Sequence, residues 1–119
     1  DIRGSYAVSD VGSVSNGDTI PEAADELVGL EGVSAVVVVG DKDGTIHLSG
    51  RSRDDRVHMG RALDAAVGDI DNASAGGHAR MGGGRVPPAV QADGTREVTA
   101  PRGEQLKTRL FDAMDGALQ

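Results

Sequence analysis

The sequence predicts a single α+β domain of the broad α/β class, in which a mixed β-sheet of about five strands packs against about three helices. Three observations lead to this prediction. The 119 residues are enough for one modest hydrophobic core. A run of β-branched residues at 33–39 is typical of a central strand buried on both faces. Segments with helical and with strand periodicity alternate, so the sheet combines a hairpin with crossover connections.

The first part of the chain is predicted to form a strand and then a helix. Apolar residues alternate over Ile2–Val8, which is the pattern of a half-buried strand. A turn at Asn16–Gly17 leads to a helix start, where Thr19 is placed to cap the backbone and Glu22 follows three residues later. The apolar positions from there to Val28 share one face of the helix.

The middle of the chain is predicted to form a hairpin and a second helix. The β-branched run Val33–Val39 is followed by a Gly-Asp-Lys-Asp-Gly turn and by a second strand at Thr45–Ser49. Apolar residues then share one face over Asp55–Ile70, which predicts a helix. Asp54 and Asp55 stand at its start, where the helix dipole favours acidic side chains.

The last part combines glycine-rich and extended segments with a closing helix. Residues Asn72–Gly84 are predicted to be a glycine-rich loop. Val86–Thr99 contains Pro87–Pro88 and Asp93–Gly94, which indicates edge segments joined by a turn. Apolar side chains share one face over Glu104–Leu118, as in an amphipathic helix.

The charge balance argues against a broad nucleic-acid surface. The chain carries a net charge of −7, which repels nucleic acid at long range unless basic residues are concentrated in one place. With no Trp, one Tyr (Tyr6) and one Phe (Phe111), it has too few aromatic rings for base stacking. Of the twelve basic residues only Lys42 and Lys107 are lysines. This acid-rich, lysine-poor composition is similar to that of salt-adapted haloarchaeal proteins, and the alternative is an ordinary acidic protein with arginine-rich codon usage.

Composition also excludes several protein classes. No apolar run approaches the ~18 residues of a membrane-spanning helix, so no membrane partner is expected. Cysteine is absent, which removes disulfides and thiolate metal sites. The polar start Asp1–Gly4 is unlike a signal peptide, and we expect a cytoplasmic protein. Because the chain begins with Asp1 instead of Met, we also expect it to be a piece of a longer protein.

The first candidate site is the stretch at 74–84, in which five glycines surround His78 and Arg80. Glycine lets a backbone approach a ligand closely and turn its N–H groups toward an anion. A histidine beside them can donate to a phosphate oxygen. The stretch is neither a Walker A loop nor the dinucleotide Gly-x-Gly-x-x-Gly motif. The alternative is a flexible surface loop in which the histidine has no function, and the spacing alone favours the two interpretations equally.

The second candidate site is at the end of the second hairpin strand. The guanidinium of Arg51 is a fork suited to two phosphate oxygens, and Ser52 adds a hydroxyl beside it. A solvated strand end is the alternative. The three histidines of the chain show no close ligand spacing, so no metal site is predicted. No catalytic residue is predicted either, because no serine lies in a nucleophile-elbow context.

Taken together and in this order, the two stretches resemble the DHH-associated domain, the C-terminal domain of DHH-family phosphoesterases. That family includes RecJ-type exonucleases, oligoribonucleases and cyclic-dinucleotide phosphodiesterases. Gly76-Gly77-His78 matches its glycine–histidine core, and Ser49-Gly50-Arg51-Ser52 matches its Ser-x-Arg-Ser strand end. Met81-Gly82-Gly83 stands where the family usually has Ala-Ala-Gly, and Ala75 stands where a further glycine is common. The resemblance covers residues 21–84.

The resemblance implies a domain that closes over a cleft and holds the phosphate and nucleotide of the substrate. The residues carried over as substrate-binding are Arg51, Ser52, Gly76, Gly77 and His78. Manganese or magnesium is expected in the missing Asp-His-His catalytic domain, which is also the expected protein partner. The chain by itself is therefore expected to bind short nucleic acid or a nucleotide phosphate, and to hydrolyse neither.

Two further candidates, Arg53 and Arg80, are added because they are close in sequence to these residues. We also predict that Arg51 and His78 converge on one anion. A right-handed crossover through the second helix can bring the glycine loop back beside the end of the strand that carries Arg51.

Three functions are compatible with the sequence. The first is the phosphate-binding domain of a metal-dependent DHH-family phosphoesterase of exonuclease or oligoribonuclease type. The second is a non-catalytic nucleic-acid-binding module, because the same domain type ends alanyl-tRNA synthetases. The third is a regulatory or structural domain. The acidic balance argues against a broad tRNA surface and is compatible with a small phosphate pocket.

Overall fold

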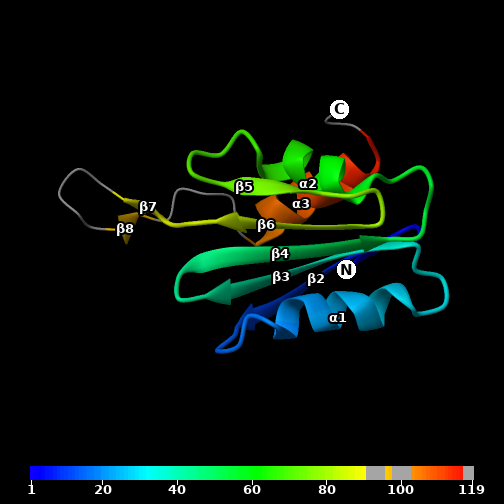
Figure 1. Cartoon of the computed structure of the whole chain (residues 1–119), viewed down its shortest axis with the longest axis horizontal. Coiled ribbons are helices and arrows are strands. Elements are labelled where there is room, and N and C mark those ends of the chain that lie inside the picture. Colours follow the sequence, from blue (N-terminus) through cyan, green and yellow to red (C-terminus); the bar gives the residue numbers. More distant parts are fainter. Residues whose placement is uncertain (91–95, 98–102, 117–119) are drawn as a thin grey trace.

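The computed structural model describes residues 1–90, 96–97 and 103–116. Its centre is a six-stranded sheet in the order β1-β2-β3-β4-β6-β5 (Figure 1). The strands of this sheet are β1 (Ile2–Arg3), β2 (Tyr6–Ser13), β3 (Ala35–Lys42), β4 (Thr45–Ser52), β5 (Ser74–Gly77) and β6 (Met81–Val86). The helices are α1 (Thr19–Val28), α2 (Met59–Val67) and α3 (Glu104–Met114). A separate two-stranded ribbon, β7 (Ala89–Val90) and β8 (Arg96–Glu97), lies beyond one end of the sheet.

The sheet is mixed, as the sequence predicts. β2 and β3 are parallel and are connected by α1 as a crossover, whereas the other neighbouring strands of this sheet are antiparallel. The β3–β4 hairpin keeps one register from the Ala35–Ser52 pair to the Lys42–Thr45 pair. The predicted α+β class is therefore confirmed, with six strands in the main sheet where about five were expected.

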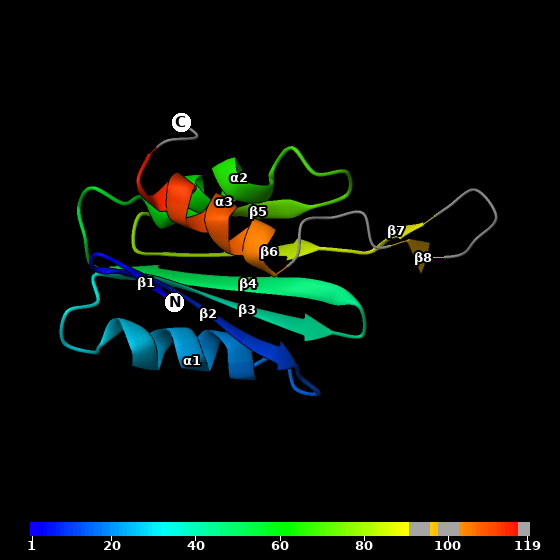
Figure 2. The same ribbon diagram turned by 180° about the vertical axis from the view of Figure 1, so that it is seen from behind.

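Helices cover both faces of the sheet (Figures 1 and 2). α1 packs on one face, where Ile20 shares a buried cluster with Val36 and Val38 of β3. α2 and α3 pack on the other face over a larger core, which includes Val37 and Val39 of β3. β3 is thus buried on both faces, which is the environment that its uninterrupted β-branched run predicts.

The N-terminal strand is broken where the alternation predicts continuity. The prediction of one strand over Ile2–Val8 is wrong, because Gly4 adopts a φ of 63° and turns the chain together with Ser5. β1 folds back antiparallel on β2, and β2 continues to Ser13. Side-chain alternation does not reveal a turn that depends on a left-handed glycine.

The start of α1 differs from the predicted capping pattern. Thr19 is the first helical residue and not the cap, and Asp18 occupies the N-cap position. The Asp18 side chain makes no capping hydrogen bond, whereas its backbone N–H donates to Asn16 Oδ1 over 2.9 Å. The helix therefore begins from a turn closed by the Asn16 side chain, a local arrangement that asparagine favours.

The second helix is shorter than predicted. The pattern over Asp55–Ile70 predicts a long helix, but α2 begins at Met59 and ends at Val67. The Asp54–Asp55 pair does not cap it. The carboxylate of Asp54 instead accepts hydrogen bonds from Arg56, which holds this segment as a turn before the helix.

The predicted glycine-rich loop at Asn72–Gly84 is wrong, because most of this stretch is the antiparallel hairpin of β5 and β6. Its glycines let α2 lie directly on the strands. A side chain at Gly60 of α2 would collide with the main chain of Gly77, and one at Gly82 would come within 2.9 Å of the Gly76 carbonyl oxygen. Close packing of helix on sheet therefore outweighs the low strand propensity of glycine.

The C-terminal part agrees with the prediction in its elements, but the closing helix is shorter than predicted. Val86 ends β6, and the short strands β7 and β8 pair antiparallel, as expected of extended edge segments. The predicted turn at Asp93–Gly94 lies outside the described residues. α3 begins at Glu104 as predicted but ends at Met114, before the predicted end at Leu118, because Asp115 is its C-cap and Gly116 turns the chain with a φ of 83°.

Candidate functional site

The two candidate stretches of the sequence lie side by side in the structure. β4 and β6 are neighbours in the sheet, and the Cα atoms of Arg51 and Met81 are paired across them. The backbone N–H of Ser52 donates to the carbonyl oxygen of Arg80 over 2.9 Å. The end of β4 therefore lies against the β5–β6 turn, which carries His78 (Figure 1).

The β5–β6 turn is fixed to the start of α2 through the main chain. The His78 carbonyl oxygen accepts a hydrogen bond from the Gly60 N–H over 2.9 Å, and the next carbonyl accepts from Met59 over the same distance. His58 is the N-cap, and its Nδ1 accepts from the Arg61 N–H over 3.1 Å. These bonds occupy the N–H groups of the first helical turn, so the N-terminus of α2 is not an anion site.

Arg51 points away from α2, toward α1. Its neighbour Gly50 faces Met59 of α2, so the Arg51 side chain leaves the strand on the opposite face. The Nε of Arg51 donates to Asp25 Oδ1 over 2.7 Å, and its Nη1 donates to the Gly50 carbonyl oxygen over 2.8 Å. The Arg51 side chain is only 14% exposed. Two bonds thus hold the guanidinium, and Nη2 has no hydrogen bond to a residue that the structure describes.

Ser52 and Arg53 make contacts within the fold. Ser52 is 5% exposed, and its Oγ donates to the Asp54 carbonyl oxygen and accepts from the Asp54 N–H, each over 3.1 Å. Arg53 donates from Nε and Nη2 to the Val33 carbonyl oxygen over 2.8 and 2.6 Å, and from Nη2 to Leu30 over 3.1 Å. Both side chains fasten the segment between β4 and α2, and their contact with a substrate stays a prediction.

His78 and Arg80 lie on the β5–β6 turn and are exposed, as are Gly77 and Arg53 among the other candidates. Arg80 pairs with Asp55 at 3.3 Å, an ion pair between two largely exposed side chains that contributes little to stability. The side chain of His78 makes no hydrogen bond within the described part of the chain. Its meeting with Arg51 at one anion stays a prediction, because the structure brings the two main-chain segments together while Arg51 itself bonds to Asp25.

Sequence reasoning missed an open strip on the α1 side of β4, β6 and β5. On β6, Met81, Gly83 and Arg85 alternate with residues that face α2, and all three are exposed. The Cα of Arg85 is paired with His47 of β4 and with Ser74 of β5. Alternate residues of a strand face the same side of the sheet, so the first, third and fifth residues of Met-Gly-Gly-Gly-Arg-Val share this face once the stretch is recognised as a strand. The strip therefore combines basic side chains with a glycine backbone.

Gly76 and Gly83 are paired in the middle of this strip. The fold does not require a glycine at Gly76, because a Cβ there would meet nothing within 4 Å and its φ is not left-handed. A Cβ at Gly83 would make one ordinary contact at 3.5 Å. Gly77, by contrast, has a φ of 146° and no room for a side chain. Gly76 and Gly83 thus leave main chain uncovered on an open face, as close approach by a ligand requires.

A hydrogen-bond network around Asp54 fixes the segment that leads from β4 to α2. Asp54 accepts from the backbone N–H, Nε and Nη2 of Arg56 over 2.9, 3.0 and 2.8 Å, and from Ser34 Oγ over 3.3 Å. The bonds from Arg56 hold the pKa of Asp54 well below its usual range. Burial raises the pKa of the nearby Tyr6 phenol. Ser34 also hydrogen-bonds Ser5 over 2.9 Å, which ties this network to the β1–β2 turn.

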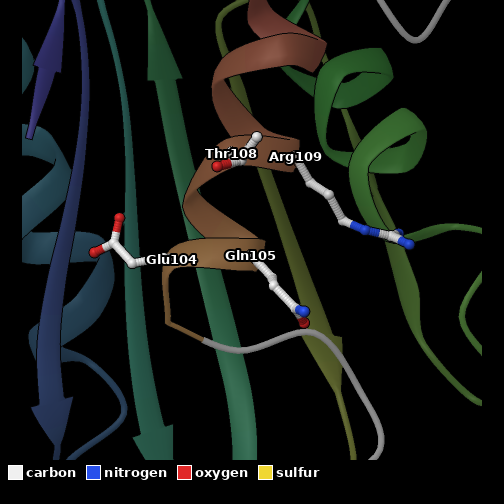
Figure 3. Close-up of a pocket in the computed structure, with 4 residues that line it drawn as sticks. All are labelled: Glu104, Gln105, Thr108 and Arg109. Atoms are coloured by element: carbon white, nitrogen blue, oxygen red, sulfur yellow. The ribbon is translucent and has the colours of Figure 1, made fainter.

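A hollow of about 510 Å³ on α3 lacks converging chemical groups. Glu104, Gln105, Thr108 and Arg109 line it (Figure 3). The side chains of Glu104 and Arg109 point to opposite sides. Arg109 donates to the Ala66 carbonyl oxygen over 3.0 Å and pairs with Asp69 at 3.1 Å, so it joins α3 to α2.

Within the described ranges, no group of three or more His, Asp and Glu side chains is placed to hold a metal ion. No helix in the described part of the chain is long and apolar enough to cross a membrane. The candidate site therefore consists of arginine, histidine and open glycine backbone, which are groups that bind anions.

A model of the DHHA1 domain matches residues 3–100 of the chain. The chain belongs to the DHHA1 domain family. This DHHA1 domain is 36% identical over 89 residues to "Uncharacterized protein MJ1633" of Methanocaldococcus jannaschii, a match that covers 75% of the chain and 17% of that protein. It also shares a fold with the C-Ala domain of alanyl-tRNA synthetase from Aquifex aeolicus, with a TM-score of 0.64, 13% identity and coverage of 92% and 91% of the two chains. The resemblance to the DHH-associated domain is thereby confirmed at the level of the family.

Proposed function

We propose that this DHHA1 domain binds the phosphate of a short nucleic acid or nucleotide, as the substrate-holding part of a metal-dependent DHH-family phosphoesterase of exonuclease or oligoribonuclease type. The observation that carries the proposal is the pair Gly76 and Gly83, which leaves main chain uncovered on the face toward which Arg51 points. Neither glycine is needed for packing or for a left-handed backbone, so a ligand that approaches the strip accounts for both.

Three kinds of donor surround this open backbone. Arg51 has Nη2 without a hydrogen bond among the described residues, Arg85 is exposed along the strip, and His78 is exposed at its turn. β5 is the last strand of the sheet, so its outward N–H groups are not used in pairing with β6. Charged hydrogen bonds from arginine and histidine to phosphate oxygens are among the strong ones in proteins. Together these groups support phosphate binding.

The bond-breaking step belongs, in this proposal, to a separate catalytic domain that holds manganese or magnesium. The described residues do not fit such a centre, since they offer no group of carboxylates and histidines for it. Hydrolysis assisted by two metals needs both ions within a few ångströms of each other. The relative from Methanocaldococcus jannaschii is matched over 17% of its length, which leaves room for a further domain in that protein.

Titration of the isotope-labelled domain with a 5′-phosphorylated RNA dinucleotide, followed by NMR, tests the proposal. We expect the largest shifts at Gly76 and Gly83. Arg51→Ala and His78→Ala should each weaken binding roughly ten- to a hundredfold, because a charged hydrogen bond contributes ~1.5–3 kcal/mol. Arg3→Ala is the matched control, because it removes a partly exposed arginine from β1, at the opposite edge of the sheet, where it pairs with Asp112 and Asp115. Unchanged affinity in both test variants would overturn the proposal.

A second candidate function is a nucleic-acid-binding module that assists no hydrolysis. It is favoured by the fold shared with the C-Ala domain of an alanyl-tRNA synthetase. The net charge of −7 favours a small phosphate site over a broad RNA surface. Titration with a folded tRNA separates the two, because tight tRNA binding that survives Arg51→Ala supports the module. If the domain binds neither the dinucleotide nor the tRNA, the result supports a regulatory or structural domain.

A further inference from the structure

We propose that Asp25 sets the charge preference of the phosphate site. By partly neutralising Arg51, this carboxylate makes the strip favour a singly charged phosphodiester over a doubly charged terminal phosphate. The inference rests on the proposed function of the strip. It assigns a role in specificity to a residue of α1, which lies outside both candidate stretches of the sequence.

Asp25 holds Arg51 from one side. Its Oδ1 accepts from Arg51 Nε over 2.7 Å, although the two residues are 26 positions apart in the chain. Arg51 is 14% exposed whereas Asp25 is 65% exposed, so the pair joins a mostly buried cation to an anion at the surface. The bond from Nη1 to the Gly50 carbonyl oxygen holds the guanidinium at a second point. A phosphate bound at the remaining edge of Arg51 is therefore also repelled by the Asp25 carboxylate.

The expected size of the effect follows from the separation of the charges. Asp25 accepts from Arg51 Nε, and the phosphate would accept from Nη2 on the other edge of the same guanidinium. With hydrogen bonds of ordinary length, the phosphorus atom then lies roughly 7 Å from the Asp25 carboxylate. In water, two like unit charges at that distance repel enough to change a binding constant about threefold. Asp25 therefore lowers the affinity for a monoanion about threefold and the affinity for a dianion about ninefold. The site thus favours the monoanion by a factor of about three.

The ion pair has little to do with holding α1 in place. α1 is anchored by its buried face, where Ile20 and Ala24 are almost fully covered. An ion pair that involves an exposed carboxylate contributes little to stability. Asp25→Asn removes the negative charge and retains an oxygen that can accept from Arg51 Nε. This variant therefore separates the charge of Asp25 from its hydrogen bond.

The preference for a monoanion is measured as the ratio of the affinities for two nucleotides that differ by one unit of charge. Adenosine 5′-monophosphate at pH 8 is a dianion, because the second phosphate pKa is about 6, and its methyl phosphodiester is a monoanion with the same base and sugar. In Asp25→Asn we expect affinity to rise about threefold for the diester and about ninefold for the monophosphate at low ionic strength. Glu26→Gln removes a charge from the next residue of α1, which is exposed and makes no hydrogen bond to Arg51 among the described residues, and should change the ratio less than Asp25→Asn does.

The outcomes separate this inference from the proposed function. An unchanged ratio in Asp25→Asn, while the wild type binds both nucleotides and Arg51→Ala loses them, overturns the role of Asp25 alone. A fall in affinity for both nucleotides in Asp25→Asn also overturns it, because Asp25 would then act only by positioning Arg51. Failure of the wild type to bind either nucleotide overturns the proposed function itself. A threefold shift in the ratio, absent from Glu26→Gln, supports the inference.

Discussion

Gly60 of α2 lies so close to Gly77 of β5 that a side chain at Gly60 would collide with the main chain of the strand. Helix and strand meet backbone to backbone, and the Gly60 N–H donates to the carbonyl oxygen of His78 over 2.9 Å. This contact fixes the β5–β6 turn to the body of the domain. His78 is therefore presented from an anchored turn and not from a free loop.

Gly60→Ala is expected to destabilise the domain by about 1–3 kcal/mol, because overpacking forces the helix away from the sheet. Gly76→Ala is the matched control, since the open space at Gly76 accepts a methyl group and the loss of unfolded-state freedom adds about 0.4–1 kcal/mol of stability. Urea denaturation of the two variants measures both values. Equal stability in the two variants would contradict the close helix–strand contact.

A larger side chain at Gly76 is expected to keep the fold and prevent ligand binding. In Gly76→Val the added methyl groups occupy the open face, where the main chain must be approached by a phosphate. Affinity for the 5′-phosphorylated dinucleotide should fall more than about tenfold, which corresponds to the loss of one charged hydrogen bond. Gly83→Val should act in the same way from the neighbouring strand. Retained affinity in both variants would show that the ligand does not approach the strip.

Much of the fold is encoded in local sequence patterns, and the rest depends on contacts between distant segments. The run Val33–Val39 identifies the central strand, because β-branched residues suit a position buried on both faces. The β5–β6 hairpin is not evident from local patterns, because two of its glycines, Gly77 and Gly82, are needed where Gly60 of the distant helix α2 approaches the strands. The candidate Arg51 is found from its motif. Its partner Asp25 comes from another element, and no local pattern connects the two.

Asp54 is expected to make stability depend on pH in the acidic range. Hydrogen bonds from Arg56 hold the pKa of Asp54 well below its usual range, so its contribution is present above the unfolded-state value of about 4 and is lost as pH falls below it. Asp54→Asn should lower the free energy of unfolding by roughly 1.5–3 kcal/mol near pH 7. The difference from the wild type should shrink below about pH 4. A difference that is constant from pH 7 to pH 2 would contradict this role.

The domain alone is expected to hydrolyse no phosphodiester. Its described residues offer no metal-binding group of carboxylates and histidines, and two-metal hydrolysis requires one. Purified domain is incubated with manganese and a labelled RNA dinucleotide, and the products are separated by chromatography. Turnover that follows the protein through purification and survives His78→Ala would contradict the assignment of this chain to substrate binding.

Molar salt is expected to stabilise the domain. The net charge of −7 produces mutual repulsion in the folded state, and salt screens that repulsion over a Debye length that falls from ~10 Å at 0.1 M to ~3 Å at 1 M. Exposed ion pairs such as Arg3–Asp112 are screened too, but each contributes too little to reverse the trend. The melting temperature should therefore rise between dilute buffer and about 2 M potassium chloride. The combined variant Glu22→Gln, Glu26→Gln, Glu31→Gln removes three exposed acidic charges and should respond less to salt. A melting temperature that is the same at both salt concentrations would contradict salt adaptation of this surface.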